Sequence, residues 1–104
     1  MSNVNKELYR NKMSTLKCCV IIPTYNNEKT IVAVINSVLE FTTDVIVVND
    51  GATDSTAELL KQFEKSITIL SYLPNKGKGV ALRTGIRHAQ EKGFCYAITI
   101  DSDG

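Results

Sequence analysis

Two carboxylates, Asp101 and Asp103, stand one residue apart and directly follow the apolar run 98–100. This pattern predicts a buried strand that delivers a pair of acids to its exposed carboxyl end. Hard divalent cations prefer oxygen ligands, and two acids this close repel each other unless a cation or a proton intervenes. The acidic pair is therefore the strongest candidate for a metal site in the sequence.

Two further segments carry weaker signals for nucleotide binding. Tyr25 can stack on a nucleobase while the backbone around Pro23 and Thr24 bonds to the base edge, although the same segment also fits a plain strand exit and helix cap. Asp50 can accept a hydrogen bond from a base N–H. Alternatively, its role is only to shape the turn that it forms with Gly51. From the residues alone, both interpretations of each segment stay open.

The segment 75–79, Asn-Lys-Gly-Lys-Gly, resembles a phosphate-binding loop. Glycines permit close approach of the backbone, and the amino end of a helix attracts anions. The spacing matches neither the P-loop nor the dinucleotide-binding motif. Lys76, Lys78 and Arg83 can therefore equally be solvated side chains.

Apolar runs alternate along the chain with segments of helical period, which predicts the order β-α-β-α-β-α-β and a mostly parallel sheet. Asn26 or Asn27 is expected to cap the first helix, and Ser55 to Glu58 fits a capping box for the second. The predicted strands are 18–22, 44–49, 67–72 and 95–100. The first helix carries its apolar stripe over 31–39, the second covers 55–63, and the third begins after Gly79 and stops at Gly93. Thr68 and Ser71 place the third strand nearer the sheet edge. The fold class is an α/β, three-layer Rossmann-like fold.

In an open parallel sheet, ligands bind beyond the carboxyl ends of the strands. The polar segments 23–26, 49–51, 73–76 and 101–103 each follow one predicted strand. They are therefore expected to meet on one rim of the sheet and to form a shared pocket there.

Length and charge exclude several classes of protein. The chain has 104 residues, 43% hydrophobic content, a formal net charge of +1 and a pI near 7.7. One domain is expected, with no general electrostatic binding of nucleic acid and no stretch of about 18 apolar residues that would span a membrane. Residues 1–17 are expected to be a polar, frayed tail, although Val4, Leu8 and Leu16 also fit a short surface helix.

Other side chains are expected to be structural. Cys18, Cys19 and Cys95 are odd in number and lack C-x-x-C spacing, which predicts reduced, buried packing residues of a cytoplasmic protein. His88 is expected to be a surface or packing residue.

Four motifs, in this order, resemble the amino-terminal half of a family-2 glycosyltransferase: 20–28, 47–54, 75–85 and 101–104. Within this family, the Gly-Lys-Gly segment resembles the branch that contains enzymes similar to dolichyl-phosphate mannose synthase and the bacterial polyprenyl-phosphate sugar transferases. The resemblance covers residues 18–104. It implies a GT-A fold, truncated after the D-x-D motif, that binds a UDP- or GDP-linked sugar and transfers the sugar with inversion.

The resemblance also implies roles for individual residues. Asp101 and Asp103 would form the D-x-D motif that holds Mg²⁺ or Mn²⁺ on the diphosphate. Asn27 separates Glu28 from Asn26, whereas many relatives carry an acid directly after that Asn. The nucleotide-sugar-binding residues implied are Pro23, Thr24, Tyr25, Glu28, Val48, Asp50, Lys78, Asp101 and Ser102.

The resemblance places no catalytic residue in this chain, because the base that assists a hydroxyl acceptor is expected beyond Gly104. The acceptor would be a polyprenyl phosphate or a glycan. Residues 18–104 alone are expected to bind a nucleotide without completing transfer. Membrane association is expected only through further segments, and an exposed edge at the fourth strand would favour self-association.

Two other classes share this layout. A sugar nucleotidyltransferase should carry a Gly- and Arg-rich loop after the first strand, where this chain has Pro23-Thr24-Tyr25. A flavodoxin-like or receiver-like module also fits the order of elements, because fold does not settle function. A receiver, however, would place acids after the first strand and an Asp after the third.

Overall fold

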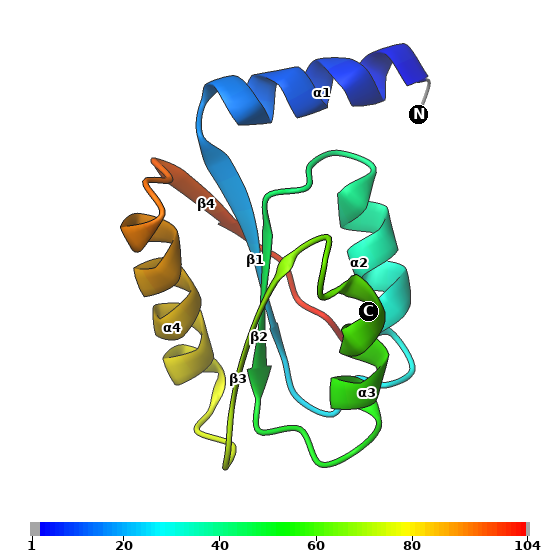
Figure 1. Ribbon diagram of the computed structural model, residues 1–104, viewed down its shortest axis with the longest axis vertical. Helices are drawn as coiled ribbons and strands as arrows, with labels where there is room; N and C mark the ends of the chain where they lie inside the picture. Colours follow the sequence, from blue (N-terminus) through cyan, green and yellow to red (C-terminus); the bar gives the residue numbers. More distant parts are fainter. Residues whose placement is uncertain (1–2, 104) are drawn as a thin grey trace.

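The computed structural model describes residues 3–103, which form an α/β fold around a sheet of four parallel strands in the order β3-β2-β1-β4 (Figure 1). This arrangement confirms the predicted fold class. The elements are α1 (Asn3–Thr15), β1 (Cys18–Thr24), α2 (Ile31–Leu39), β2 (Val45–Asp50), α3 (Thr56–Leu60), the 3-10 helix η1 (Lys61–Phe63), β3 (Thr68–Tyr72), α4 (Lys78–Glu91) and β4 (Tyr96–Thr99).

Strands β1 and β2 form the centre of the sheet, and every residue of both strands is buried. Their side chains alternate between two apolar clusters, because successive residues of a strand point to opposite faces. Val20, Ile22 and Val47 pack with α2 and α3, whereas Ile21 and Val48 pack with α4. Figure 1 shows α4 on one side of the sheet and α2 with α3 on the other.

Helix α4 approaches the sheet closely at Gly85. A Cβ atom on Gly85 would lie 2.6 Å from Ile21 Cγ2 and 3.3 Å from Val48 Cγ2. Such distances are shorter than van der Waals contact, so a larger residue would push the helix away from the strands. The small residue therefore fixes the position of α4 against β1 and β2.

The outer strands β3 and β4 differ from the central pair. The edge position predicted for β3 is confirmed. The expectation that the last strand is buried is wrong, because all four residues of β4 are exposed, Tyr96 and Ile98 among them. The physical reason is that, within residues 3–103, β4 lies at the sheet edge and none of its residues belongs to either apolar cluster. Apolar residues on an edge strand stay exposed unless another element covers them.

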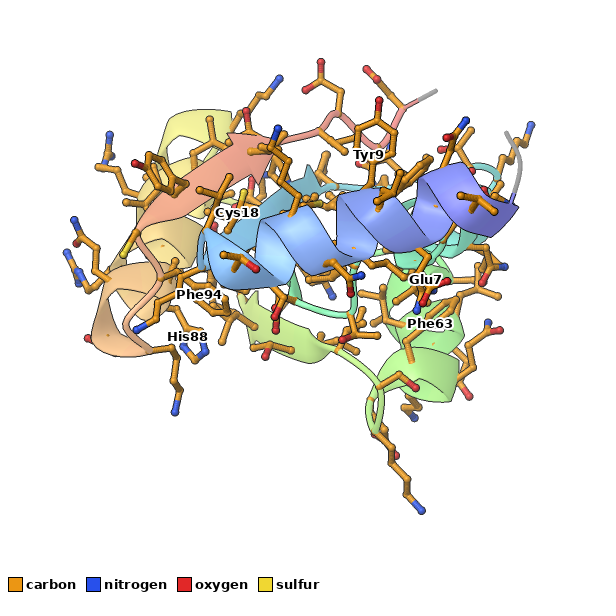
Figure 2. The ribbon with its side chains drawn as sticks, turned by 90° about the horizontal axis from the view of Figure 1, so that it is seen from above. Glu7, Tyr9, Cys18, Phe63, His88 and Phe94 are labelled. Carbon is orange, nitrogen blue, oxygen red and sulfur yellow. The ribbon has the colours of Figure 1, made fainter. Side chains whose placement is uncertain are left out.

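The expected frayed tail is also wrong, and the alternative of a short surface helix is confirmed, because residues 3–15 form helix α1. Arg10 donates hydrogen bonds to the carbonyl oxygens of Leu39 and Glu40 at the end of α2. Lys6 forms an ion pair with Glu40 at 3.1 Å, and the Tyr9 ring packs edge-on against Phe41. Figure 2 shows α1 lying across the amino-terminal end of the sheet. No helix in the described part of the chain is long and apolar enough to cross a membrane.

Two predicted helix starts are wrong in detail. Helix α2 begins at Ile31 rather than beside Asn26 or Asn27, and neither α2 nor α3 has a side-chain cap on its N-cap residue. The backbone N–H of Ser55 donates instead to the Glu28 carboxylate at 3.1 Å. The Thr56 N–H donates to the Asp54 carboxylate at 2.9 Å. A local bond to Asp54 and a long-range bond to Glu28 therefore replace the expected capping box.

The cysteine prediction is confirmed for two residues of three. Cys18 and Cys19 are buried in β1, whereas Cys95 is exposed. Cys95 directly precedes β4, so the missing cover of this edge strand accounts for its exposure as well. His88 is partly buried on α4, as expected for a surface or packing residue.

Candidate functional site

A cavity of about 350 Å³ lies at the carboxyl ends of the strands, at the opposite end of the sheet from α1. Its walls come from the segments that follow β1 and β2, from the start of α4 and from the segment after β4. The lining residues are Pro23, Thr24, Tyr25, Asn27, Asp50, Asn75, Gly77, Lys78, Ala81, Asp101, Ser102 and Asp103. The cavity is thus the shared pocket that the topology predicts.

Eight of the ten residues implied as nucleotide-binding or metal-binding line this cavity, and the two exceptions are Glu28 and Val48. Val48 is fully buried in the cluster that faces α4. Glu28 joins two loops, since its N–H donates to Asp54 and its carboxylate accepts from Ser55. The predicted ligand roles of Glu28 and Val48 therefore have no direct counterpart in the cavity lining.

Asn27, which the sequence did not mark as a site residue, connects two walls of the cavity. Its Oδ1 accepts hydrogen bonds from Thr24 Oγ1 at 2.9 Å and from the Tyr25 N–H at 3.1 Å. Ser102 Oγ lies 2.7 Å from the same Oδ1 and 2.9 Å from the carbonyl oxygen of Pro23. The buried Ser102 is thereby tied to the loop after β1, which fixes the peptide between the two acids.

Asp50 forms the second wall of the cavity. Its side chain is nearly inaccessible, with the residue 3% exposed, and its carboxylate accepts three hydrogen bonds from the loop 75–77. Oδ2 accepts from Asn75 Nδ2 at 2.7 Å and from the Gly77 N–H at 3.0 Å. Oδ1 accepts from the Lys76 N–H at 2.8 Å. Asp50 therefore holds the loop that leads into α4, and a base N–H would share a carboxylate that already has three donors.

Tyr72 lies behind Asp50 at the end of β3. Burial raises the pKa of Tyr72 to about 12, and the neighbouring Asp50 carboxylate acts in the same direction. The buried Tyr72 hydroxyl nevertheless has no hydrogen-bond partner of good geometry among residues 3–103. Tyr72 thus borders the polar wall without joining its hydrogen-bond network.

The third wall carries the acidic pair. Asp101 Oδ1 forms an ion pair with Lys78 Nζ across the cavity, and both side chains are largely exposed, at 64% and 61%. The hydrogen bond to Asp101, the charge of Asp101 and, more weakly, the charge of Asp103 raise the pKa of Lys78 above its usual value. The acids therefore already hold a positive charge at the position predicted for the metal.

The acidic pair fits a Mg²⁺ or Mn²⁺ ion that also takes ligands from a diphosphate. Among the described residues, no group of three or more His, Cys, Asp or Glu side chains could hold a metal ion. Mg²⁺ commonly binds through only one or two carboxylates, together with water and substrate phosphate oxygens. Asp101 and Asp103 supply this number of carboxylates, and the bound ammonium of Lys78 shows that the position favours a cation.

The model of glycosyl transferase family 2 matches residues 19–104 of this sequence. The chain belongs to this family. The resemblance drawn from the four motifs is therefore confirmed at the level of the family.

Curated relatives of this family-2 chain include two enzymes named for dolichyl phosphate. The UDP-N-acetylglucosamine–dolichyl-phosphate N-acetylglucosaminyltransferase of Methanococcus voltae is 34% identical over 101 residues, covering 82% of this chain and 40% of that protein. The dolichyl-phosphate beta-glucosyltransferase of Dictyostelium discoideum is 29% identical, covering 91% of this chain and 33% of that protein. The chain thus spans between a third and two fifths of the length of these relatives.

Solved structures of glycosyltransferases share the fold. S. aureus TarS 1–349 in complex with UDP is 28% identical, with a TM-score of 0.71, covering 83% of this chain and 27% of that one. Glucosyl-3-phosphoglycerate synthase from Mycobacterium tuberculosis, solved with Mn²⁺ and UDP-glucose, is 24% identical with a TM-score of 0.71, covering 94% and 37%. The predicted GT-A fold is confirmed by these similarities.

Proposed function

We propose that this chain is the donor-binding half of an inverting glycosyltransferase that takes a sugar from a nucleoside diphosphate and passes it to an isoprenoid phosphate. The observation that carries the proposal is the shared cavity lined by Tyr25, Asp50, Asp101 and Asp103. A slot for a base and a pair of acids for a cation-bound diphosphate lie in one hollow of suitable size.

The nucleoside would occupy the side of the cavity formed by the loop after β1. Tyr25 is exposed in this loop, so one face of its ring is available for stacking on a base. We propose uridine as the preferred base, because the Methanococcus relative is named for a UDP-sugar and TarS binds UDP. The diphosphate would then lie between the start of α4 and the acidic pair.

Asp101 and Asp103 would hold Mg²⁺ or Mn²⁺, which as a Lewis acid stabilises the negative charge that grows on the departing diphosphate. Ser102 would keep the two acids at a fixed spacing, because its hydroxyl is bonded to Pro23 and Asn27. Lys78 would add a second positive charge beside the phosphates. These residues assist only the leaving-group half of the reaction.

The acceptor half of the reaction follows from the charge of an isoprenoid phosphate. A phosphate monoester is largely ionised at pH 7, so its oxygen can attack the anomeric carbon without a general base. The two relatives named for dolichyl phosphate support this class of acceptor. We propose that the reaction occurs on the cytoplasmic side of a membrane, which is consistent with the free thiols of Cys18, Cys19 and Cys95.

Calorimetric titration of the folded chain with UDP and GDP, with and without Mn²⁺, tests the proposal. We expect UDP to bind, its affinity to rise at least about tenfold with Mn²⁺, and GDP to bind more weakly. The variant Glu91→Gln, which neutralises an exposed acid at the far end of α4, is the control and should bind like the wild type. A folded sample with no metal-dependent binding of either nucleotide would contradict the proposal.

A further inference from the structure

The ion pair between Lys78 and Asp101 places an ammonium group where the divalent cation is expected. We infer that the Lys78 ammonium occupies the cation position of the acidic pair when no ligand is bound. The metal then binds tightly only when a diphosphate is present to pair with the ammonium that the metal displaces. This inference rests on the proposed function and adds an order to it: nucleotide and metal bind together, and metal alone binds poorly.

The start of α4 at Lys78 is anchored, while the charged end of the Lys78 side chain is exposed. The preceding residues Lys76 and Gly77 donate their N–H groups to the buried Asp50, which anchors the start of α4 on β2. The Lys78 side chain leaves this anchored point, and its exposed end reaches across the cavity to Asp101. An anchored backbone with an exposed ammonium group suits an exchange of partners without movement of the fold.

The charges in the cavity explain why the exchange depends on the nucleotide. Lys78 neutralises one of the two acids, so a divalent ion that arrives alone meets a site with a net charge of only about −1 and must also expel the ammonium group. A diphosphate brings several negative charges to the same cavity. The expelled ammonium can then pair with phosphate oxygens, so its displacement costs less free energy.

A neighbouring lysine provides a matched control. Lys76 lies in the same loop and carries the same charge, but its ammonium group sits 5.2 Å from the centroid of the Tyr72 ring, and Lys76 does not line the cavity. Lys76→Gln therefore changes the net charge as Lys78→Gln does, without removing the ion pair to Asp101. The variant Lys78→Arg keeps the positive charge.

The test measures Mn²⁺ binding without nucleotide, by the electron paramagnetic resonance signal of free Mn²⁺. Lys78→Gln should bind Mn²⁺ about fivefold more tightly than the wild type, because the competing ion pair is gone. Lys76→Gln should change the affinity less than about twofold, and Lys78→Arg should stay near the wild type. Equal effects of the two Gln variants, or no gain in Lys78→Gln, would overturn the inference.

The second measurement is UDP binding in saturating Mn²⁺, by calorimetry. Lys78→Gln should lose about tenfold in affinity, because a charge-assisted hydrogen bond to the phosphates is missing, while Lys76→Gln should lose little. Opposite effects of Lys78→Gln on Mn²⁺ alone and on UDP are the signature of the exchange, and unchanged UDP binding would overturn it. A wild-type chain that binds Mn²⁺ but no UDP would refute the proposed function instead. In that case, the Mn²⁺ affinities of Lys78→Gln and Lys76→Gln would still test whether the Lys78 ion pair competes with the metal.

Discussion

The cavity has two acidic walls, one formed by Asp50 and the other by Asp101 and Asp103. They differ in how many hydrogen-bond and ion-pair partners their carboxylates already have. Asp50, at the end of the central strand β2, is buried and accepts three hydrogen bonds from the loop 75–77. Asp101 and Asp103, after the edge strand β4, are exposed, and Asp101 has one exposed ammonium partner, that of Lys78. The hydrogen bonding of the Asp50 wall is therefore complete before any ligand arrives, whereas the wall formed by Asp101 and Asp103 can still bind a ligand.

The Asp50 wall therefore maintains the structure of the cavity, whereas the acidic pair supplies charge for binding. A buried carboxylate with full hydrogen bonding stabilises the loop around it, and its removal leaves donors without partners. An exposed carboxylate contributes little to stability but can exchange a weak partner for a stronger one. Substitutions on the two walls should consequently have opposite profiles, with large effects on stability at Asp50 and large effects on activity at the acidic pair.

The largest effect is expected for Asp103→Ala in the full-length protein. Loss of one of the two proposed metal ligands should lower sugar transfer by about 10³-fold, because charge on the leaving diphosphate is no longer stabilised. Asp103 is exposed, so the free energy of unfolding should change by less than about 0.5 kcal/mol. Transfer from a radiolabelled donor and urea unfolding measure the two quantities. Unchanged turnover would refute the metal role of Asp103.

The next largest effect is expected for Gly51→Ala, in the turn that directly follows Asp50. Gly51 has φ of +68°, and a Cβ atom there would lie 2.2 Å from the backbone nitrogen of Asn75. Strain and collision with a backbone that cannot give way should lower the free energy of unfolding by about 4 kcal/mol.

Gly77→Ala is the matched control for this prediction. Gly77 also has positive φ, at +99°, but no atom lies within 4 Å of its added Cβ. Gly77 has ψ of 161°, in a backbone region that glycine alone adopts readily. Only this conformational strain remains in Gly77→Ala, so thermal unfolding should report a loss of about 1–3 kcal/mol. Equal losses in the two variants would show that the turn at Gly51 and the loop at Asn75 are not in tight contact.

Asp50→Ala should lower the free energy of unfolding by about 3 kcal/mol, since the amides of Lys76 and Gly77 and the side chain of Asn75 lose their acceptor. Asp101→Ala should change it by less than about 0.5 kcal/mol, because the lost ion pair is exposed. Urea unfolding of both variants compares the two walls directly. A similar loss in both would remove the distinction between them.

The sequence predicted the central strands and the gathering of the site well because both depend on local patterns and one topological rule. Unbroken apolar runs mark β1 and β2, and the carboxyl ends of parallel strands must meet on one rim. Tyr25, Asp50, Asp101 and Asp103 are brought together for this reason.

The features that the sequence missed depend on distant partners. An apolar run does not reveal how many neighbours a strand has, so β4 was expected to be buried. Helix α1 is polar, and its contacts through Arg10 and Tyr9 lie about 30 residues away along the chain. Asn27 reads as a helix cap locally, but its partner Ser102 is 75 residues distant. Local chemistry offers no signal for such pairs.

The smallest effect is expected for Tyr72→Phe, beside the Asp50 wall. The Tyr72 hydroxyl is buried without a good partner in the described part of the chain, so its removal should change the free energy of unfolding at pH 7 by less than about 1 kcal/mol. The folded-state pKa of Tyr72, about 12, lies above the value near 10 of an unfolded tyrosine. The unfolded state therefore loses this proton first, and stability should fall as pH rises from about 10 to about 12. Urea unfolding at pH 9 and pH 11 should show a smaller fall in Tyr72→Phe than in the wild type or in Tyr96→Phe, a substitution on the exposed β4. The same fall in all three proteins would place the Tyr72 hydroxyl in contact with solvent rather than behind Asp50.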